Sequence, residues 1–341
     1  MRQVYLVRHA MPDIPVGERW CVGRTDLPLG TVGRMQAALL PFVPELLDKP
    51  VFCSHLIRAI DTARPLCPSP MIREGLEEQD MGVWDGLSFT EIKTRFPTLY
   101  AARENNPHLW PEGAETMESV KLRMHAAILH CLEETEGDIV VVSHKSAIDS
   151  ITGSRPKLLH TSISRVAWDG QQLNPLEIGK IPHPKLTEEV CMSVLQAAGA
   201  QEPVIAHCRA VAEEALRLAD GLPTDQSALD RNLLLAASLL HDVARAEPNH
   251  AVTGAVWIRA LGYPDVADVI VQHHDCERIA IDEASVLYLA DKYILGTQHV
   301  TLEERFSASA LKCETEEAKT AHAHRYEAAL ALEKQIVRRC F

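Results

Sequence analysis

The sequence predicts two domains of different fold class, joined by a short linker. Residues 1–180 are expected to form an α/β three-layer domain, a mostly parallel sheet with helices on both faces, because short apolar runs alternate there with stretches of helical spacing. Residues 186–341 are expected to be all-α, because strand-like runs end before them and apolar residues recur with helical periodicity. The segment 179–185 holds one glycine and two prolines, a composition typical of a linker.

Three apolar runs, at 4–7, 51–53 and 139–142, define the predicted sheet. None of them alternates with polar residues, which is typical of parallel strands buried on both faces. A helix is expected after the first run, because apolar residues between positions 35 and 42 recur with helical spacing. Another helix follows the second run directly.

The other elements of the first half follow from local signals. Ser88 and Glu91 form a capping box that begins a helix ending before Pro97. A long amphipathic helix is expected to end near residue 135. Asp169-Gly170 is the turn signal of a hairpin at the end of the domain.

Cationic and imidazole side chains stand where the predicted strands end. Arg8 and His9 follow the first strand, His144 follows the third, and Arg58 lies in the first turn of the helix after the second. Ligand sites in open α/β sheets lie beyond the carboxyl ends of the strands. Arginine presents a planar fork to phosphate oxygens, neutral imidazole can attack phosphorus, and helix N-terminal amides attract anions. We therefore expect a phosphate site at this edge of the sheet.

Charge restricts the partners of the chain. The net charge is −13, and residues 185–341 hold 15 Lys and Arg against 24 Asp and Glu. Neither half has the basic face of a nucleic-acid-binding protein, so we expect small phosphorylated substrates and no nucleic-acid polymer. Local cations or a metal must then capture an anionic substrate.

No run approaches the ~18 apolar residues that span a bilayer, and the first residues carry no secretion signal. Nine cysteines, an odd number without a C-x-x-C pair, indicate free thiols in a reducing compartment. We expect a cytoplasmic protein without a membrane partner. The oligomeric state stays open, a homo-oligomer included.

Six motifs follow one another in the first half. They lie at residues 6–10, 23–29, 54–63, 78–86, 111–115 and 142–144. Together they resemble the histidine phosphatase (phosphoglycerate mutase-like) superfamily, and within it the α-ribazole phosphatase-like enzymes, over about residues 2–180. The resemblance implies a phosphoglycerate mutase-like fold.

The resemblance also implies roles for single residues. His9 is the nucleophile that becomes phosphorylated, and Glu78 is the acid that protonates the leaving oxygen. Arg8, Arg58 and His144 hold the phosphoryl oxygens. No metal is implied for this domain.

Arg24 and Thr25 lie in the second motif and are expected to bind substrate. The sequence departs from the family after His144, where Lys145 stands in place of glycine, and at Asp149, which replaces an arginine. Two interpretations of Lys145 remain: it contacts a second anionic group of the substrate, or it is a solvated residue of the next helix.

Histidines and aspartates recur along the predicted helices of the second half. In order they are His207, His241, Asp242, His250, His273, His274 and Asp291. His241-Asp242 ends an apolar helix, and Asp291 lies on a second one, so several ionisable groups are expected in the core. Buried charges need partners, and a divalent metal satisfies all of them together.

This ordered series resembles the HD-domain metal-dependent phosphohydrolases over about residues 186–300. The resemblance implies that His207, His241, Asp242 and Asp291 bind one metal. His250 and His274 are candidates for a second metal or for phosphate contact, and Arg245 is a candidate for substrate binding. Mixed imidazole and carboxylate ligands suit Mn, Fe, Co, Ni or Zn. His322 and His324, in a tail expected to form a charged helix, are predicted to be solvated.

These observations predict a bifunctional phosphohydrolase. The first domain is expected to be a phosphomonoesterase acting on a small metabolite, either α-ribazole phosphate-like or a nucleotide or sugar phosphate, and the HD domain to hydrolyse a nucleotide or another phosphoester. One alternative is that the HD domain senses a nucleotide and regulates the phosphatase. A second alternative is that the first domain is a phosphoglycerate-type mutase.

Overall fold

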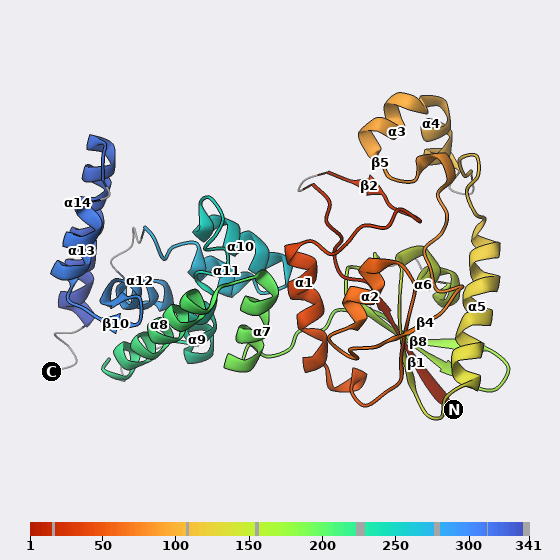
Figure 1. Ribbon diagram of the computed structural model, residues 1–341, viewed down its shortest axis with the longest axis horizontal. Coiled ribbons are helices and arrows are strands. Elements are labelled where there is room, and N and C mark those ends of the chain that lie inside the picture. Colours follow the sequence, from red (N-terminus) through yellow and green to blue (C-terminus); the bar gives the residue numbers. More distant parts are fainter. Residues whose placement is uncertain are drawn as a thin grey trace. The chain divides into compact units, whose positions relative to one another are not determined.

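The computed structural model describes residues 1–15, 18–106, 109–153, 157–222, 229–275, 280–311 and 313–336 (Figure 1). The chain divides into two compact units, residues 1–184 and 185–341, and each is described by itself. Among the described helices, none has the length and apolar character needed to cross a membrane.

A six-stranded sheet forms the centre of the first unit, in the order β4-β3-β6-β1-β7-β8. The four parallel strands are β1 (Arg2–Arg8), β3 (Val51–Cys53), β4 (Met71–Ile72) and β6 (Ile139–Ser143). An antiparallel hairpin, β7 (Ile163–Trp168) and β8 (Leu173–Lys180), completes one edge and turns at Asp169-Gly170. The predicted mostly parallel sheet is confirmed.

Helices cover both faces of this sheet. Leu6 of β1 packs into the core that contains helix α5 (Met117–Glu133) and helix α6 (Lys145–Thr152). Val7 points to the opposite core, where α2 (Ile57–Ala63) packs. Helix α1 (Thr31–Ala38) contacts α2, and the short turns η1 (Leu40–Phe42) and η2 (Pro44–Leu46) follow it. Alternate residues of an apolar run therefore fill two cores, as expected for a strand buried on both faces.

The first unit also contains a small additional lobe. It consists of β2 (Trp20–Cys21), η3 (Gly82–Trp84), β5 (Leu87–Ser88), α3 (Phe89–Arg95) and α4 (Pro97–Asn105). Trp84 and Ile92 are buried in a core of its own, and α3 and α4 project away from the sheet (Figure 1). The capping box of Ser88 and Glu91 is present at the start of α3.

The second unit is built of helices. These are α7 (Glu188–Ala198), α8 (Glu202–Asp220), α9 (Arg231–Leu240), α10 (His250–Ala260), α11 (Pro264–Ile270), α12 (Glu283–Tyr293), α13 (Leu302–Ala310) and α14 (Glu316–Ile336). Helix α12 is buried along its length from Ala284 onward, so it is the centre of the unit.

Two details of this unit differ from the sequence prediction. A short ribbon, β9 (Ile294–Leu295) and β10 (Gln298–His299), turns at Gly296, whose φ is +64°. Strands of two residues are too short to leave an alternating pattern in a sequence. The tail forms two helices, α13 and α14, which pack against each other and against α12.

Candidate functional site

The parallel pairing of β1 with β6 brings two histidines together. Arg8, the last residue of β1, pairs with Ser143, the last residue of β6. His9 and His144, the next residue of each chain segment, therefore lie side by side at the ends of these two strands. Their ring centroids are 4.9 Å apart, and both side chains are buried. The backbone N–H of His9 donates to the Ser143 carbonyl over 2.8 Å. The predicted proximity at the carboxyl ends of the strands is present.

One hydrogen bond determines the tautomer of His9. Its Nδ1 lies 2.7 Å from the Ala10 carbonyl, and a carbonyl can only accept, so Nδ1 carries the proton. Nε2 is then the unprotonated, nucleophilic nitrogen. Burial, together with the nearby imidazoles of His144 and His160, holds the pKa of His9 well below its usual value, so the ring is neutral at pH 7.

Two buried arginines accompany these rings. Arg58, at the second position of α2, donates from Nη1 to the Thr25 carbonyl (2.8 Å) and from Nη2 to the Gly23 carbonyl (2.7 Å). A Cβ at Gly23 would lie 2.6 Å from the Gln79 carbonyl oxygen, so this close approach requires glycine. Arg8 donates to the Leu158 carbonyl over 2.6 Å, and burial lowers its pKa to about 10, which leaves it charged at neutral pH.

Several buried nitrogens around His9 have no hydrogen-bond partner among the described residues. They are both ring nitrogens of His144 and the Nε atoms of Arg8 and Arg58. Buried polar atoms are nearly always hydrogen-bonded in folded proteins, so a group of orphaned ones marks a place for a ligand. Because the cationic members of this group are N–H donors, the arrangement fits the oxygens of a phosphoryl group.

The carboxylate of Glu78 lies beside the first turn of α6. Its two carboxylate oxygens are 3.1 and 3.3 Å from the backbone N–H of Ser146, which donates to them. Arg123, on α5, donates to the carbonyls of Glu77 (2.7 Å) and Glu78 (3.0 Å) and so holds the loop in place. Sequence reasoning missed Arg123, because an arginine on an amphipathic helix carries no motif.

The predicted substrate-binding residues have partners within the protein. Arg24 lies 3.1 Å from Glu77, and the Thr25 hydroxyl donates to Asp85 over 2.9 Å. Lys145 forms a 2.6 Å ion pair with Asp149, the residue that departs from the family pattern.

His160, which sequence reasoning also missed, lies beside the nucleophile. Its Nδ1–H donates to the His9 carbonyl over 3.0 Å, and its Nε2 is 3.4 Å from Nη2 of Arg8. The rings of His9 and His160 are 5.3 Å apart. A single histidine in a loop has no neighbouring pattern that would identify it.

We expect acid to destabilise the first unit through these histidines. Burial lowers the pKa of His160 from 6.5 to about 3, so below pH 6.5 the unfolded chain binds a proton that the folded chain does not. Each such group costs up to about 1.4 kcal/mol of unfolding free energy per pH unit in that window. The melting temperature of this unit, measured by calorimetry between pH 7 and 5, should fall with pH. His160→Asn should make the fall shallower, and an unchanged slope would contradict the assignment.

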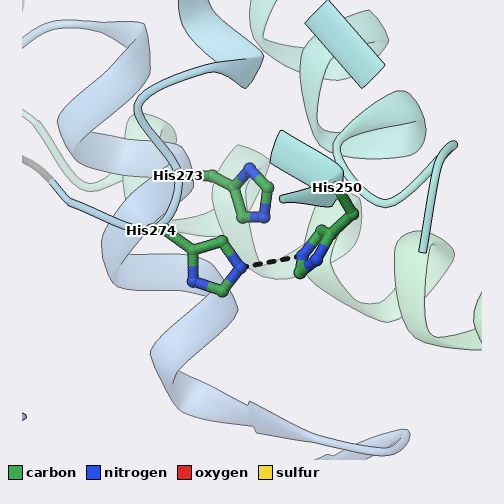
Figure 2. Close-up of side chains that lie close together, drawn as sticks. All are labelled: His250, His273 and His274. Carbon is green, nitrogen blue, oxygen red and sulfur yellow. Dashed lines mark hydrogen bonds between the residues drawn. The ribbon is translucent and has the colours of Figure 1, made fainter. Parts of the chain in front are cut away.

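In the second unit the series of histidines and aspartates converges. Two groups have ligand atoms that all lie within 4.8 Å of one another: His207 with His241 and Asp291, and His250 with His273 and His274. Figure 2 shows the three imidazoles of the second group close together, with Nε2 of His274 2.8 Å from Nε2 of His250. His273, which our sequence analysis did not assign as a ligand, is the buried member of that group.

Backbone carbonyls orient three of these rings in the same way. Nδ1 of His207 donates to Gly296 (2.8 Å), Nδ1 of His241 to Ser238 (2.8 Å), and Nδ1 of His273 to Ile270 (2.7 Å). Each ring therefore turns its Nε2 inward, the arrangement that surrounding contacts impose on metal ligands. Nε2 of His207 lies 3.2 Å from a carboxylate oxygen of Asp291, and although burial lowers the pKa of His207, this hydrogen bond raises it above its usual value. The small β9-β10 ribbon supplies the Gly296 carbonyl, a role that its sequence does not reveal.

Asp242 lies between the two groups. One carboxylate oxygen is 3.7 Å from His241 Nε2, and the other is 3.2 Å from His250 Nε2. Burial alone would raise the pKa of Asp242, but His241, His250 and Arg245 outweigh it and lower the pKa below its ordinary value. Nε2 of His241 and of His273 are buried without a hydrogen-bond partner among the described residues. This donor set fits divalent metal ions.

A cavity of about 440 Å³ opens beside these residues. Arg245, whose Nη1 is 3.1 Å from His250 Nε2, lies on its wall. His322 also lines the cavity, and its Nε2 lies 2.8 Å from the Ser309 hydroxyl. His322 is half-buried because α14 folds back against α13, and it belongs to neither of the two candidate metal-binding groups among the described residues. His324 is exposed, as predicted.

Family models match a stretch of each unit. The family model of the histidine phosphatase superfamily (branch 1) matches residues 4–180, and the HD domain model matches residues 204–295. Both are phosphohydrolase families, and HD domains typically bind divalent metals.

Single relatives cover parts of the chain. A tRNA (cytidine(56)-2'-O)-methyltransferase of Picrophilus torridus is 32% identical over 156 residues, which cover 42% of this chain and 43% of that protein. The chain thus spans less than half the length of the first curated relatives it matches. Among solved structures, Bacillus stearothermophilus YhfR is 25% identical and covers 53% of this chain and 98% of its own, with a TM-score of 0.49.

The α-ribazole phosphatase of Shigella flexneri is 22% identical and covers 52% of this chain and 96% of its own, with a TM-score of 0.44. The superfamily model spans more than half of the sequence and includes His9, Arg58, Glu78 and His144. The chain belongs to the histidine phosphatase superfamily, and an HD domain follows its phosphatase domain.

Proposed function

We propose that this chain is a bifunctional phosphohydrolase with two independent sites. Residues 1–180 form a phosphomonoesterase that acts through a phosphohistidine on a small metabolite, α-ribazole phosphate-like or a nucleotide or sugar phosphate. Residues 186–341 form a metal-dependent HD phosphohydrolase that acts on a nucleotide or another phosphoester. The free Nε2 of His9, held among unpaired arginine and histidine nitrogens, carries the proposal for the first site.

The geometry around His9 supports the following proposed reaction at the first site. Nε2 attacks phosphorus, the bond from phosphorus to the leaving oxygen breaks, and Glu78 supplies the proton that this oxygen takes. Arg8, Arg58 and His144 stabilise the charge that develops on the equatorial oxygens. Water then attacks the phosphohistidine and gives its proton to the Glu78 carboxylate, the bond from phosphorus to Nε2 breaks, and inorganic phosphate leaves, which restores His9 and the acid form of Glu78.

The second site is proposed to hold divalent transition metal, of the group Mn, Fe, Co, Ni and Zn. His207, His241, Asp242 and Asp291 would hold one ion, and His250, His273 and His274, with Asp242 between the groups, a second. Such an ion supplies a nucleophilic hydroxide from bound water at neutral pH. Arg245 is placed to contact the phosphoryl oxygens of a substrate. The seven described cysteines are free thiols, which agrees with the proposed cytoplasmic location.

The test uses the full chain in three forms: wild type, His9→Ala and Asp242→Ala. Each is screened against a panel of phosphorylated metabolites with and without chelator. We expect one chelator-resistant activity that only His9→Ala removes, and one chelator-sensitive activity that only Asp242→Ala removes. A metal-loaded protein without any chelator-sensitive turnover would favour a sensing role for the HD domain. Phosphoryl transfer between monophosphoglycerates would favour a mutase.

Glu78→Gln tests the acid. An alkyl phosphate has a poor leaving group that must be protonated, whereas p-nitrophenyl phosphate does not need this help. We therefore expect kcat to fall by roughly 100-fold or more on an alkyl phosphate, the size of a general-acid contribution, and by a much smaller factor on p-nitrophenyl phosphate. The matched control is Glu91→Gln, in the exposed capping box of α3. Equal losses on both substrates would transfer the acid role to another residue.

A further inference from the structure

Helices α13 and α14 form one wall of the cavity beside the metal ligands. The HD family model ends at residue 295, before both helices begin. Arg305, Phe306 and Ser309 of α13, and His322 and Arg325 of α14, nevertheless line the cavity. This wall therefore comes from a part of the chain that the HD family pattern does not describe.

The wall is held in a defined position. The guanidinium of Arg325 donates to both oxygens of Asp275, over 2.6 and 3.2 Å, and the Tyr288 hydroxyl of α12 donates to the Arg325 carbonyl over 2.7 Å. Phe306 is buried, with its ring 5.3 Å from His322 and 4.8 Å from that of Tyr326. Side chains fixed in this way lose little entropy when a ligand binds.

Arg305 differs from Arg325 in its bonding. Its Nε is buried and has no hydrogen-bond partner among the described residues, whereas Arg325 is paired with Asp275. Arg305 lines the cavity, and because its guanidinium has no accepting partner among the described residues, it has donors left for a ligand. The acceptor that suits it best is an anionic oxygen, because charge-assisted hydrogen bonds from arginine are the strong ones.

The charged residues that line the cavity also favour an anionic ligand. Residues 185–341 are acidic in total, yet Arg245, Lys292, Arg305 and Arg325 are among the described residues that line this cavity. The nearby carboxylates already have partners. Asp242 and Asp291 lie among the candidate metal ligands, and Asp275 pairs with Arg325. A volume of about 440 Å³ is of the size that holds a small metabolite or nucleotide.

We propose that the α13–α14 wall binds a second anionic group of the HD substrate, so that this site selects a small molecule carrying two phosphates: the scissile ester lies at the metal ligands and the second phosphate contacts Arg305. The inference rests on the proposed HD phosphohydrolase. Arg305 acts here as a specificity-determining residue, and Arg325 supports the wall through Asp275.

A binding experiment tests this without turnover. Adenosine 3',5'-bisphosphate and adenosine 5'-monophosphate are titrated calorimetrically into the full chain carrying His9→Ala, so that the first site does not consume them. We expect the bisphosphate to bind at least about tenfold more tightly than the monophosphate, the size of a charge-assisted pair. Arg305→Gln should reduce the ratio of the monophosphate Kd to the bisphosphate Kd to near one. It should change the monophosphate Kd itself by less than about threefold.

Controls separate the inference from folding and from the HD activity itself. Lys319→Gln removes an exposed cation of α14 that pairs with Glu316, and it should leave the ratio unchanged. Arg305→Lys should restore part of the ratio. Metal content and melting temperature should equal those of wild type in every variant.

The outcomes are distinct. The proposal is overturned if the ratio of the two dissociation constants is the same in wild type and Arg305→Gln. It is also overturned if Lys319→Gln lowers this ratio as much as Arg305→Gln does. Hydrolysis of bis(p-nitrophenyl) phosphate, which has no second phosphate, reports the metal centre alone. If that hydrolysis is absent in the metal-loaded protein, the proposed HD reaction fails, while the ratio of the two binding constants still decides the role of Arg305.

Discussion

Replacement of His9 by alanine is expected to reduce hydrolysis of p-nitrophenyl phosphate by roughly three orders of magnitude or more. The bond from Nδ1 of His9 to the Ala10 carbonyl leaves its Nε2 unprotonated, so the substitution removes the proposed nucleophile. Steady-state kinetics with the full chain measures the loss. Arg8, Arg58 and His144, whose imidazole is neutral because burial holds its pKa well below the usual value, stay in place, so some phosphate affinity should survive.

His125→Ala is the matched control for this experiment. His125 lies on α5, with its ring 6.4 Å from Trp168 and no contact with His9, and its loss should leave the rate unchanged. Rapid alkaline quench of wild type with labelled substrate should also trap phosphate on the protein, because the P–N bond of phosphohistidine is labile in acid and stable in alkali, and His9→Ala should trap none. A His9→Ala protein that retains more than a small fraction of the activity, or that still traps phosphate, would refute the phosphohistidine mechanism.

The second large effect is expected for Asp242→Ala. Asp242 lies between the two groups of histidines, with carboxylate oxygens 3.7 Å from His241 and 3.2 Å from His250. Its loss should strip most of the bound metal and reduce chelator-sensitive hydrolysis by more than about 100-fold, the upper range for loss of a residue that only supports a ligand. The melting temperature of residues 185–341 should fall, because metal that binds only the folded state stabilises it.

Elemental analysis of the purified protein gives the first readout, and the His9 activity gives the second. Asp268→Ala serves as the control, because Asp268 is exposed and pairs with Arg259 away from the cavity. An unchanged metal content in Asp242→Ala contradicts the assignment. Loss of both activities together would show that the two sites are not independent.

Much of the first site was accessible from the sequence because its signals are local. The apolar runs that form β1, β3 and β6 are unbroken, and the residue types that follow them are those that bind phosphate. Since parallel strands end at the same edge, the expected meeting of His9 and His144 needed no further information. The lobe of α3 and α4 was harder to predict, because the capping box at Ser88 is the one local signal that marks the start of α3.

The second site illustrates the limit of such reasoning. The order of histidines and aspartates indicated a metal centre, but not which of His273 and His274 is buried, because adjacent residues after a helix have no periodicity to assign them. The charged, weakly amphipathic α14 reads as a solvated helix, yet its packing on α13 brings His322 and Arg325 to the cavity.

The sequence by itself determined the class of both domains and indicated the residue types of their candidate sites, because helical periodicity, unbroken apolar runs and strand-end residues are properties of neighbouring positions. Only the tertiary structure decided which atoms face the ligand. The bond from His160 to the His9 carbonyl joins residues 151 positions apart, and the bond from His207 to the Gly296 carbonyl spans 89. The tautomers of these rings, the place of Asp242 between two groups of ligands and the wall built by α13 and α14 depend on how distant segments pack, and no local pattern encodes them.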